Sequence, residues 1–268
     1  MGGFARRMSY WNAFAKKFPS RALLRIDGGS VFMRGSATSP VVNRYMLEGT
    51  QLSSLDALNM TSWDIPVWQE IGDMVAAGLI PANFLKLPLV CGNVTTKLPN
   101  FPAFQRFIIR ELQVDPKAGK PLRVGITGIL SDPEERISRR DFQVQKPDDA
   151  ARQLVADMKG KADYIILVTD LGLGQAISLA IGVPGIHMIV VVHDYAAPTE
   201  AQQVAESLVL GPVNEGRMLS EVRLNIRSGT SKVDIESHLI ALDRTVPDDP
   251  KMAELIKRAQ TAVDKAQK

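Results

Sequence analysis

The sequence predicts an α/β fold in which mixed β-sheets are sandwiched between helices, and three observations lead to this prediction. Short apolar runs alternate with amphipathic stretches along most of the chain, which is the pattern of an α/β domain. Two of these runs are apolar enough to form strands that are covered on both faces. Near the C-terminal end, polar and apolar residues alternate strictly, which indicates a half-exposed antiparallel hairpin.

The N-terminal half is expected to start with an amphipathic helix within residues 1–20. Arg21–Asp27 (RALLRID) predicts a buried strand that ends at a glycine pair. Leu55–Met60 predicts a second strand, and Pro66–Ala77 predicts the helix that follows it. Two long loops are expected, over residues 36–54 and 99–120.

The middle of the chain continues the alternation of strands and helices. Leu122–Thr127 predicts a strand, and Asp148–Lys159 predicts an amphipathic helix with Asp149 as its N-cap. Asp163–Thr169 (DYIILVT) and Pro184–Val192 (PGIHMIVVV) are the two most apolar runs, and we expect both to be strands. A short helix is expected between them, after a glycine-containing turn.

The C-terminal part predicts a hairpin followed by a helix. The segments MLSEVRLNI and KVDIESHLIAL alternate in polarity across the turn RSGTS, as the two strands of a hairpin do. Residues 249–268 are rich in Ala, Lys and Glu, with Pro250 in the expected first turn of a helix. We therefore expect one domain over residues 1–248 and a C-terminal linking helix over residues 249–268.

Composition and charge exclude several classes of protein. Apolar residues make up 45% and charged residues 23% of the 268 residues, which excludes a disordered, collagen-like or coiled-coil chain. The 32 Lys and Arg residues against 29 Asp and Glu leave a net charge of +3, too small to predict a nucleic-acid partner. Apolar runs are under half of the roughly 20 residues that a membrane helix needs. The single cysteine, Cys91, excludes an intrachain disulfide and is expected to be a small buried apolar residue.

Polar residues that follow the expected strands are the candidate chemical groups. In open α/β sheets, ligands bind at the edge where the strands have their carboxyl ends. Asp27, Asp64, Asp170 and His193 lie at such ends, with Asp194 beside the histidine. Carboxylates and imidazoles are ligands of divalent metals, so these residues are candidate metal ligands. The same residue types also serve as turn formers and helix caps, and both interpretations stay open at this point.

Other features of the sequence point to chemistry less strongly. No H-E-x-x-H, G-x-S-x-G or P-loop pattern is present, which excludes zincin, α/β-hydrolase and P-loop enzymes. His187 and His238 are expected to be packed or surface residues. Gly172 and Gly174 follow a strand, but Ile177 stands where a dinucleotide fingerprint has its third glycine. A nucleotide bound at this turn without hydrolysis is therefore the weakest of three hypotheses.

Seven segments match the pattern of one known family in the same order. They are GGFARR at residues 2–7, DGGSVF at 27–32, DALNMTSWD at 56–64, LPLVCGNV at 87–94, VGITG at 124–128, VTDLG at 168–172 and GIHMIVVVHDY at 185–195. With these segments the chain resembles the metallophosphoesterase domain of the 5′-nucleotidase family, within the calcineurin-like phosphoesterases. The resemblance spans nearly the whole chain and implies a four-layer α/β/β/α fold. It also implies a site built for two metal ions and a phosphoester.

The chemical positions of the family pattern hold other residue types in this chain. The bridging Asp falls on Ser30, the ligand Asn on Ser62, the phosphate-facing His on Trp63, a ligand His on Asp170 and the last ligand His on Tyr195. His193 keeps the family's residue type, and Asp170 is a chemically suitable substitute for a histidine. The family's first strand, with its Asp-x-His pair, falls before residue 1.

Two further hypotheses follow from this resemblance. The first is a degenerate and catalytically inactive domain that serves as a binding or structural module and needs no cofactor. It is favoured because two-metal hydrolysis requires ions about 3.5–4 Å apart with a bridging group, which one imidazole and one carboxylate do not supply. The alternative is a metal-dependent phosphoester or nucleotide hydrolase with a rebuilt site. Its one divalent metal ion would be held by Asp27, Asp64, Asp170 and His193.

The resemblance also implies a partner and a location. Without the family's first strand the sheet has an exposed edge, and we expect a second copy of the chain or a partner chain to fill it. Family members generally work outside the cytoplasm. The N-terminal segment, however, lacks the apolar core and the cleavage site of a signal peptide, so these two expectations conflict.

Overall fold

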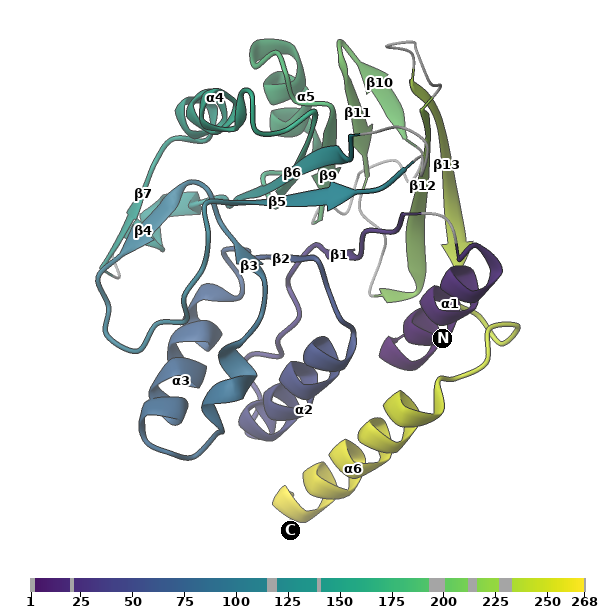
Figure 1. Ribbon diagram of the computed structural model, residues 1–268. Coiled ribbons are helices and arrows are strands. Elements are labelled where there is room, and N and C mark those ends of the chain that lie inside the picture. The colour runs from purple at the N-terminus through teal and green to yellow at the C-terminus, as the bar shows by residue number, and fades with distance from the viewer. Residues whose placement is uncertain are drawn as a thin grey trace.

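A computed structural model of the chain describes most of its residues (Figure 1). The described ranges are residues 3–19, 22–114, 120–138, 141–192, 201–211, 216–226 and 233–267, with the side chains of residues 226 and 233 left out. The turn expected at residues 227–231 lies outside these ranges, as do His193, Asp194 and Tyr195.

The sheets form two layers. The first layer contains the parallel strands β1 (Ile26–Asp27), β2 (Ala57–Asn59) and β3 (Leu89–Val90), together with the separate hairpin of β12 (Met218–Ile226) and β13 (Val233–Ala241). The second layer is a six-stranded mixed sheet in the order β10-β11-β9-β8-β6-β5. Its strands are β5 (Phe107–Leu112), β6 (Leu122–Ile129), β8 (Tyr164–Thr169), β9 (Met188–Val191), β10 (Gln202–Val204) and β11 (Ser207–Leu210).

Helices cover the outer face of each layer, as Figure 1 shows. The helices α4 (Pro147–Met158) and α5 (Leu173–Gly182) pack on the six-stranded sheet through residues such as Leu154 and Leu179. The helices α2 (Ser39–Leu52) and α3 (Ile65–Ala76) pack on β2 and β3, where Trp68 is fully buried. A third apolar cluster lies between the sheets and contains Val124, Ile166 and Val168. The predicted sandwich of mixed sheets between helices is therefore confirmed.

The remaining elements complete the two ends of the fold. Two short strands, β4 (Val94–Thr96) and β7 (Phe142–Val144), form a small antiparallel ribbon, and single 3₁₀ turns lie at Ala82–Leu85 and Pro133–Glu135. The helices α1 (Phe4–Lys17) and α6 (Pro250–Ala266) pack together through Ala5, Met252 and Leu255. In the described part of the chain no helix is both long and apolar enough to cross a membrane.

Three local predictions were wrong, and the buried strand predicted over Arg21–Asp27 forms only at Ile26–Asp27. The loop expected over residues 36–54 contains helix α2, whose buried face includes the polar residues Asn43 and Thr50, so apolar periodicity alone did not reveal it. The loop expected over residues 99–120 contains β5, an edge strand that pairs antiparallel with β6. Asp149 is not an N-cap, because α4 begins at Pro147 and its N-cap is Lys146, which makes no side-chain capping bond.

The hairpin and the C-terminal helix were predicted correctly. Strands β12 and β13 pair antiparallel from Met218 opposite Ala241 to Ile226 opposite Val233. Helix α6 begins at Pro250, and the Asp249 side chain accepts hydrogen bonds of 3.1 Å from the backbone N–H groups of Lys251 and Met252. Such an N-cap satisfies two of the N–H groups that every helix start leaves free.

Candidate functional site

The candidate residues lie where strands of both layers have their carboxyl ends. Asp27 is the last residue of β1, and Asp64 follows β2 as the N-cap of α3. Asp170 follows β8, and Ser131 lies two residues beyond the end of β6. Because β1 and β2 are parallel, as are β6 and β8, each pair of ends opens on the same edge of its sheet.

Asp170 joins the loops of the two layers. Its carboxylate accepts hydrogen bonds from the backbone N–H of Ser62 at 2.8 Å, from the Ser62 hydroxyl at 2.7 Å and from the backbone N–H of Ser131 at 2.5 Å. Burial raises the pKa of Asp170, and these hydrogen bonds partly offset that rise. The carboxylate is therefore already satisfied by donors from within the chain.

Asp64 organises the segment that follows β1. Its carboxylate accepts hydrogen bonds from the backbone N–H of Ser30 at 2.6 Å, from the hydroxyl of Thr61 at 2.9 Å and from the backbone N–H of Phe32 at 3.4 Å. Asp64 is 1% exposed, and burial raises its pKa from 3.8 to about 6 against the opposing effect of the hydrogen bonds. The Asp64 side chain therefore holds the backbone of Ser30 and Phe32 in place and does not face solvent.

The raised pKa of Asp64 predicts a dependence of stability on pH. The unfolded chain releases this proton near pH 3.8 and the folded chain releases it near pH 6, so the folded state holds more protons between these values. Stability from this group therefore falls as the pH rises through that window, by about 3 kcal/mol, and is constant above it. Urea unfolding from pH 4 to pH 7 checks this, with Asp64→Asn expected to remove this part of the fall and to leave the part that the raised pKa of Asp170 contributes. Equal pH profiles for the two proteins would contradict the prediction.

Asp27 is neutralised by a cation from the N-terminal helix. The guanidinium group of Arg7 in α1 lies 2.7 Å from the Asp27 carboxylate, which is 6% exposed. Asp27 also accepts a 3.1 Å hydrogen bond from the backbone N–H of Gly29. The rings of Phe4 and Trp11 flank the guanidinium, with centroids 4.7 and 5.0 Å from its central carbon. A metal ion at Asp27 would have to compete with this fixed positive charge.

Ser30 and Trp63 occupy surface positions beside these carboxylates. Ser30 has a backbone φ of 56°, a left-handed conformation that is uncommon outside glycine, and its hydroxyl lies 3.2 Å from that of Thr61. Trp63 is 49% exposed and donates its indole N–H to the Phe32 carbonyl at 3.1 Å. The guanidinium of Arg34 stacks 4.6 Å from the indole centroid. The indole is thus fixed at the surface and has no acid–base function.

The described residues do not fit a metal ion. No group of three or more His, Cys, Asp or Glu side chains gathers at one point in the ranges that the structure covers. Asp170, Asp64 and Asp27 accept their hydrogen bonds from three different sets of donors. His187 is packed instead, since its Nδ1 accepts a 3.0 Å hydrogen bond from the backbone N–H of Ile165. His238 lies on the exposed strand β13, as expected for a surface residue.

Sequence reasoning missed the residues that hold the candidates in place. Arg7 was quoted only as part of the GGFARR segment and was given no role, because its partner lies in another element and no local pattern marks such a pair. Ser131 follows a strand in the same way as Asp170 does, so the strand-end rule would have found it. Its contribution is a backbone N–H, which any residue type except proline supplies.

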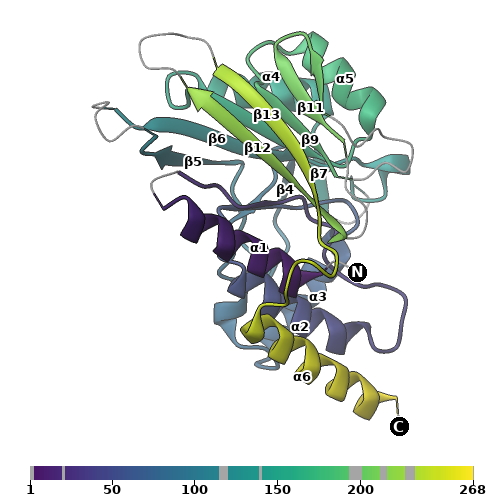
Figure 2. The same ribbon diagram turned by 90° about the vertical axis from the view of Figure 1, so that its right-hand side faces the viewer.

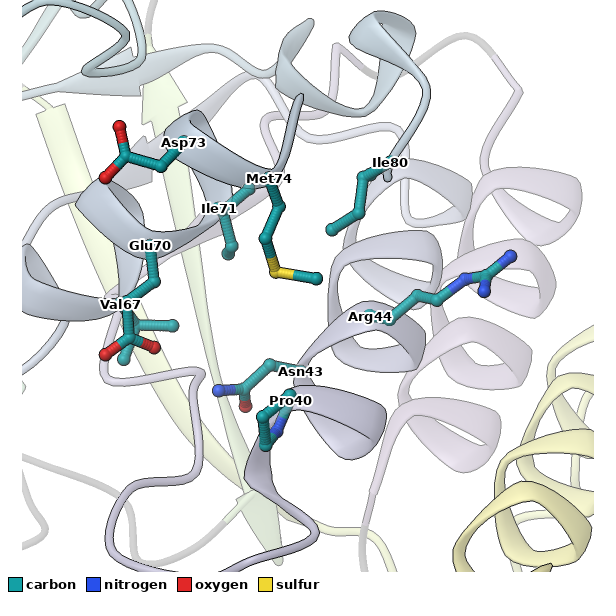
Figure 3. Close-up of a pocket in the computed structure, with 9 residues that line it drawn as sticks. All are labelled: Pro40, Asn43, Arg44, Val67, Glu70, Ile71, Asp73, Met74 and Ile80. Carbon is teal, nitrogen blue, oxygen red and sulfur yellow. The ribbon is translucent and has the colours of Figure 1, made fainter. Parts of the chain in front are cut away.

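The structure also contains a pocket that the sequence did not predict. A pocket of about 330 Å³ lies between α2 and α3 (Figure 3). Val67, Ile71 and Met74 are among its apolar lining residues, and the charged side chains of Arg44 and Glu70 line it from the two helices. None of the candidate residues at the strand ends lines this pocket, so it is separate from the site described above.

Comparisons with known proteins agree on the fold. No family model matches the sequence, and no curated protein matches it. Among solved structures, the sulfate thiohydrolase SoxB of Thermus thermophilus superposes with a TM-score of 0.77 at 14% identity, over 97% of this chain and 47% of SoxB. The calcineurin-like phosphoesterase YfkN of Bacillus subtilis gives a TM-score of 0.72 at 18% identity, over 100% of this chain and 91% of YfkN.

A 5′-nucleotidase precursor from Thermus thermophilus gives a TM-score of 0.72 at 17% identity, over 98% of this chain and 53% of the precursor. The chain thus spans about half the length of SoxB and of this precursor. Identities this low show the fold alone. The chain has the α/β fold of the calcineurin-like metallophosphoesterases and of the 5′-nucleotidases that share it.

Proposed function

We propose that this chain is a metallophosphoesterase-like domain without hydrolase activity, which serves as a binding or structural module. The observation that supports the proposal most is the use of its carboxylates. Asp170 and Asp64 accept hydrogen bonds from backbone and hydroxyl groups, and Asp27 pairs with Arg7. Each carboxylate is therefore engaged by groups of the chain itself, whereas a catalytic metal ligand would face the ion.

The chemistry of two-metal hydrolysis explains why the retained groups are insufficient. Two divalent ions about 3.5–4 Å apart need several negative or imidazole ligands and a bridging group that holds an activated water. The bridging position of the family pattern is Ser30, and a neutral hydroxyl does not balance the charge of two dications. A site with a single metal needs at least three protein ligands, which the described residues do not gather at one point.

The rival function is a metal-dependent phosphoester hydrolase whose rebuilt site would hold one metal ion with Asp27, Asp64, Asp170 and His193. A turnover assay separates the two. The substrates are p-nitrophenyl phosphate, bis(p-nitrophenyl) phosphate and adenosine monophosphate, each with and without added Mn²⁺ or Zn²⁺. We expect no metal-dependent turnover in the unmodified protein and no change in His193→Ala. Metal-dependent hydrolysis that His193→Ala abolishes, in a protein of unchanged stability, would overturn the proposal and establish the rival.

A further inference from the structure

The pocket between α2 and α3 has a predominantly apolar lining. Val67, Ile71 and Ile80 are each 3% exposed, and the first two belong to the buried cluster beneath the two helices. Met74 is half-buried, and Figure 3 shows its side chain extending from α3 towards α2. The volume of about 330 Å³ lies within the range of ligand pockets, which is about 300–1,000 Å³. The pocket can therefore cover a small apolar body such as one ring.

Hydrogen bonds to neighbouring loops hold both helices that form the pocket. In α2, the Asn43 side chain accepts a 2.8 Å hydrogen bond from the N–H of Met33 and donates one of 2.9 Å to the Met33 carbonyl. In α3, the Asp73 carboxylate accepts a 3.2 Å hydrogen bond from the Asn100 side chain. A pocket with fixed walls binds a ligand without the cost of ordering them.

Charged side chains line the rim of this pocket. Arg44 and Glu70 are exposed and make no ion pair or hydrogen bond with other described residues. Figure 3 shows their charged groups on opposite sides of Met74, with the Arg44 guanidinium pointing away from the other labelled side chains. Asp73 adds a second carboxylate to the α3 wall, where its hydrogen-bond partners are neutral side-chain amides. Within the described chain, the α3 wall therefore carries two negative charges that no cation neutralises.

We propose that this pocket binds a small molecule that combines an apolar body with a positively charged nitrogen, such as an aromatic amine with a short alkyl chain. The apolar body lies against Val67, Ile71 and Met74, and the ammonium group faces the carboxylates of the α3 wall. An anionic head group would be repelled by these carboxylates, and Arg44 directs its charge away from the pocket. The pocket is separate from the strand-end carboxylates, so this inference goes beyond the proposed function.

The test uses three probes that separate the contribution of the ring from that of the charge. Phenethylammonium has both features, 3-phenylpropanoate has the same ring and chain with a negative charge, and ethylammonium has the positive charge without the ring. Each probe is titrated into protein labelled with ¹³C at its methionine methyl groups. The Met74 methyl group reports on the pocket, and Met252, which is buried between α1 and α6, is the internal reference.

We expect phenethylammonium to shift the Met74 signal in a saturable way and to leave Met252 unchanged. The dissociation constant of 3-phenylpropanoate should be higher by about fivefold or more, because one probe is attracted and the other repelled by the same wall. Ethylammonium should leave the Met74 signal in place. No saturable shift with phenethylammonium, or equal binding of any two probes, would overturn the proposal.

Two charge-neutralising variants assign the recognition to the α3 wall. Glu70→Gln is expected to weaken phenethylammonium binding by about two- to fivefold. Arg44→Gln, on the opposite side of the pocket, is the matched control and should change this binding by less than about twofold. Both side chains are exposed, so neither substitution disturbs the core. Equal binding by Glu70→Gln and the parent, or a larger loss in Arg44→Gln, would contradict the assignment.

Discussion

Replacing Gly128 with alanine is expected to lower the free energy of unfolding by about 3 kcal/mol, because it forces the two sheet layers apart. A Cβ atom at this position would lie 2.1 Å from the side-chain oxygen of Asn59 and 2.8 Å from the carbonyl oxygen of Val90. Asn59 and Val90 belong to the first layer, and Gly128 to β6 of the second. The Gly128 carbonyl also accepts a 2.6 Å hydrogen bond from the N–H of Gly92, and this bond holds the backbone of β6 close to the segment that follows β3.

Gly125→Ala provides the matched control in the same strand. Its Cβ would lie 2.6 Å from the sulfur of Met158 and 3.1 Å from the Cβ of Ala162. The thioether is flexible and moves at little cost, whereas the backbone carbonyl facing Gly128 does not. Urea denaturation of both variants is the measurement, and Gly125→Ala is expected to lose clearly less stability. Equal losses would show that Gly128 does not set the distance between the layers.

Asp170→Ala is expected to destabilise the metal-free protein by about 3 kcal/mol, the second large effect. The substitution leaves the backbone N–H groups of Ser62 and Ser131 without their acceptor and disconnects the loops of the two layers. Hydrogen bonds to charged acceptors contribute about 1.5–3 kcal/mol each, and burial of the carboxylate offsets part of that sum. Chemical denaturation in the presence of a chelator measures the change.

Whether Asp170→Ala lowers or raises the stability of the metal-free protein distinguishes an inactive binding or structural module from a metal-dependent hydrolase. A carboxylate held in place for a metal ion repels its neighbours when the ion is absent, so its removal would stabilise the metal-free protein. A carboxylate that accepts backbone hydrogen bonds stabilises that protein, and its removal does the opposite. Ser62→Ala is the control, because it removes only the 2.7 Å hydroxyl bond and is expected to lose about 1 kcal/mol. An Asp170→Ala variant as stable as the parent in chelator would contradict the structural role.

The alternation of apolar runs with helical stretches was enough to predict the layers of the fold. β8 is buried along its whole length, as its apolar sequence indicates, and the predicted hairpin forms between β12 and β13, although the buried residue of β12 is Glu221. Helix α2 was missed because its buried face contains Asn43, whose amide bonds to both backbone groups of Met33. A buried polar residue of this kind stabilises a helix through a specific partner, which periodicity does not report.

The composition of the candidate site was predictable in part. The strand-end rule located Asp27, Asp64 and Asp170 correctly at the carboxyl edges of strands. It did not show what each carboxylate contacts, because Arg7 and Ser131 reach them from distant parts of the sequence. The assignment of these residues as metal ligands stays a prediction, since the histidine expected beside them lies outside the described residues.

The most direct test of the central claim is the number of divalent ions that the purified chain binds. Native mass spectrometry after incubation with Mn²⁺ or Zn²⁺ and removal of excess metal reports this number for the intact protein. We expect the metal-free protein to dominate the spectrum, both for the parent chain and for Asp170→Ala. A stoichiometric complex with one or two ions, lost in Asp170→Ala or in His193→Ala, would contradict the account.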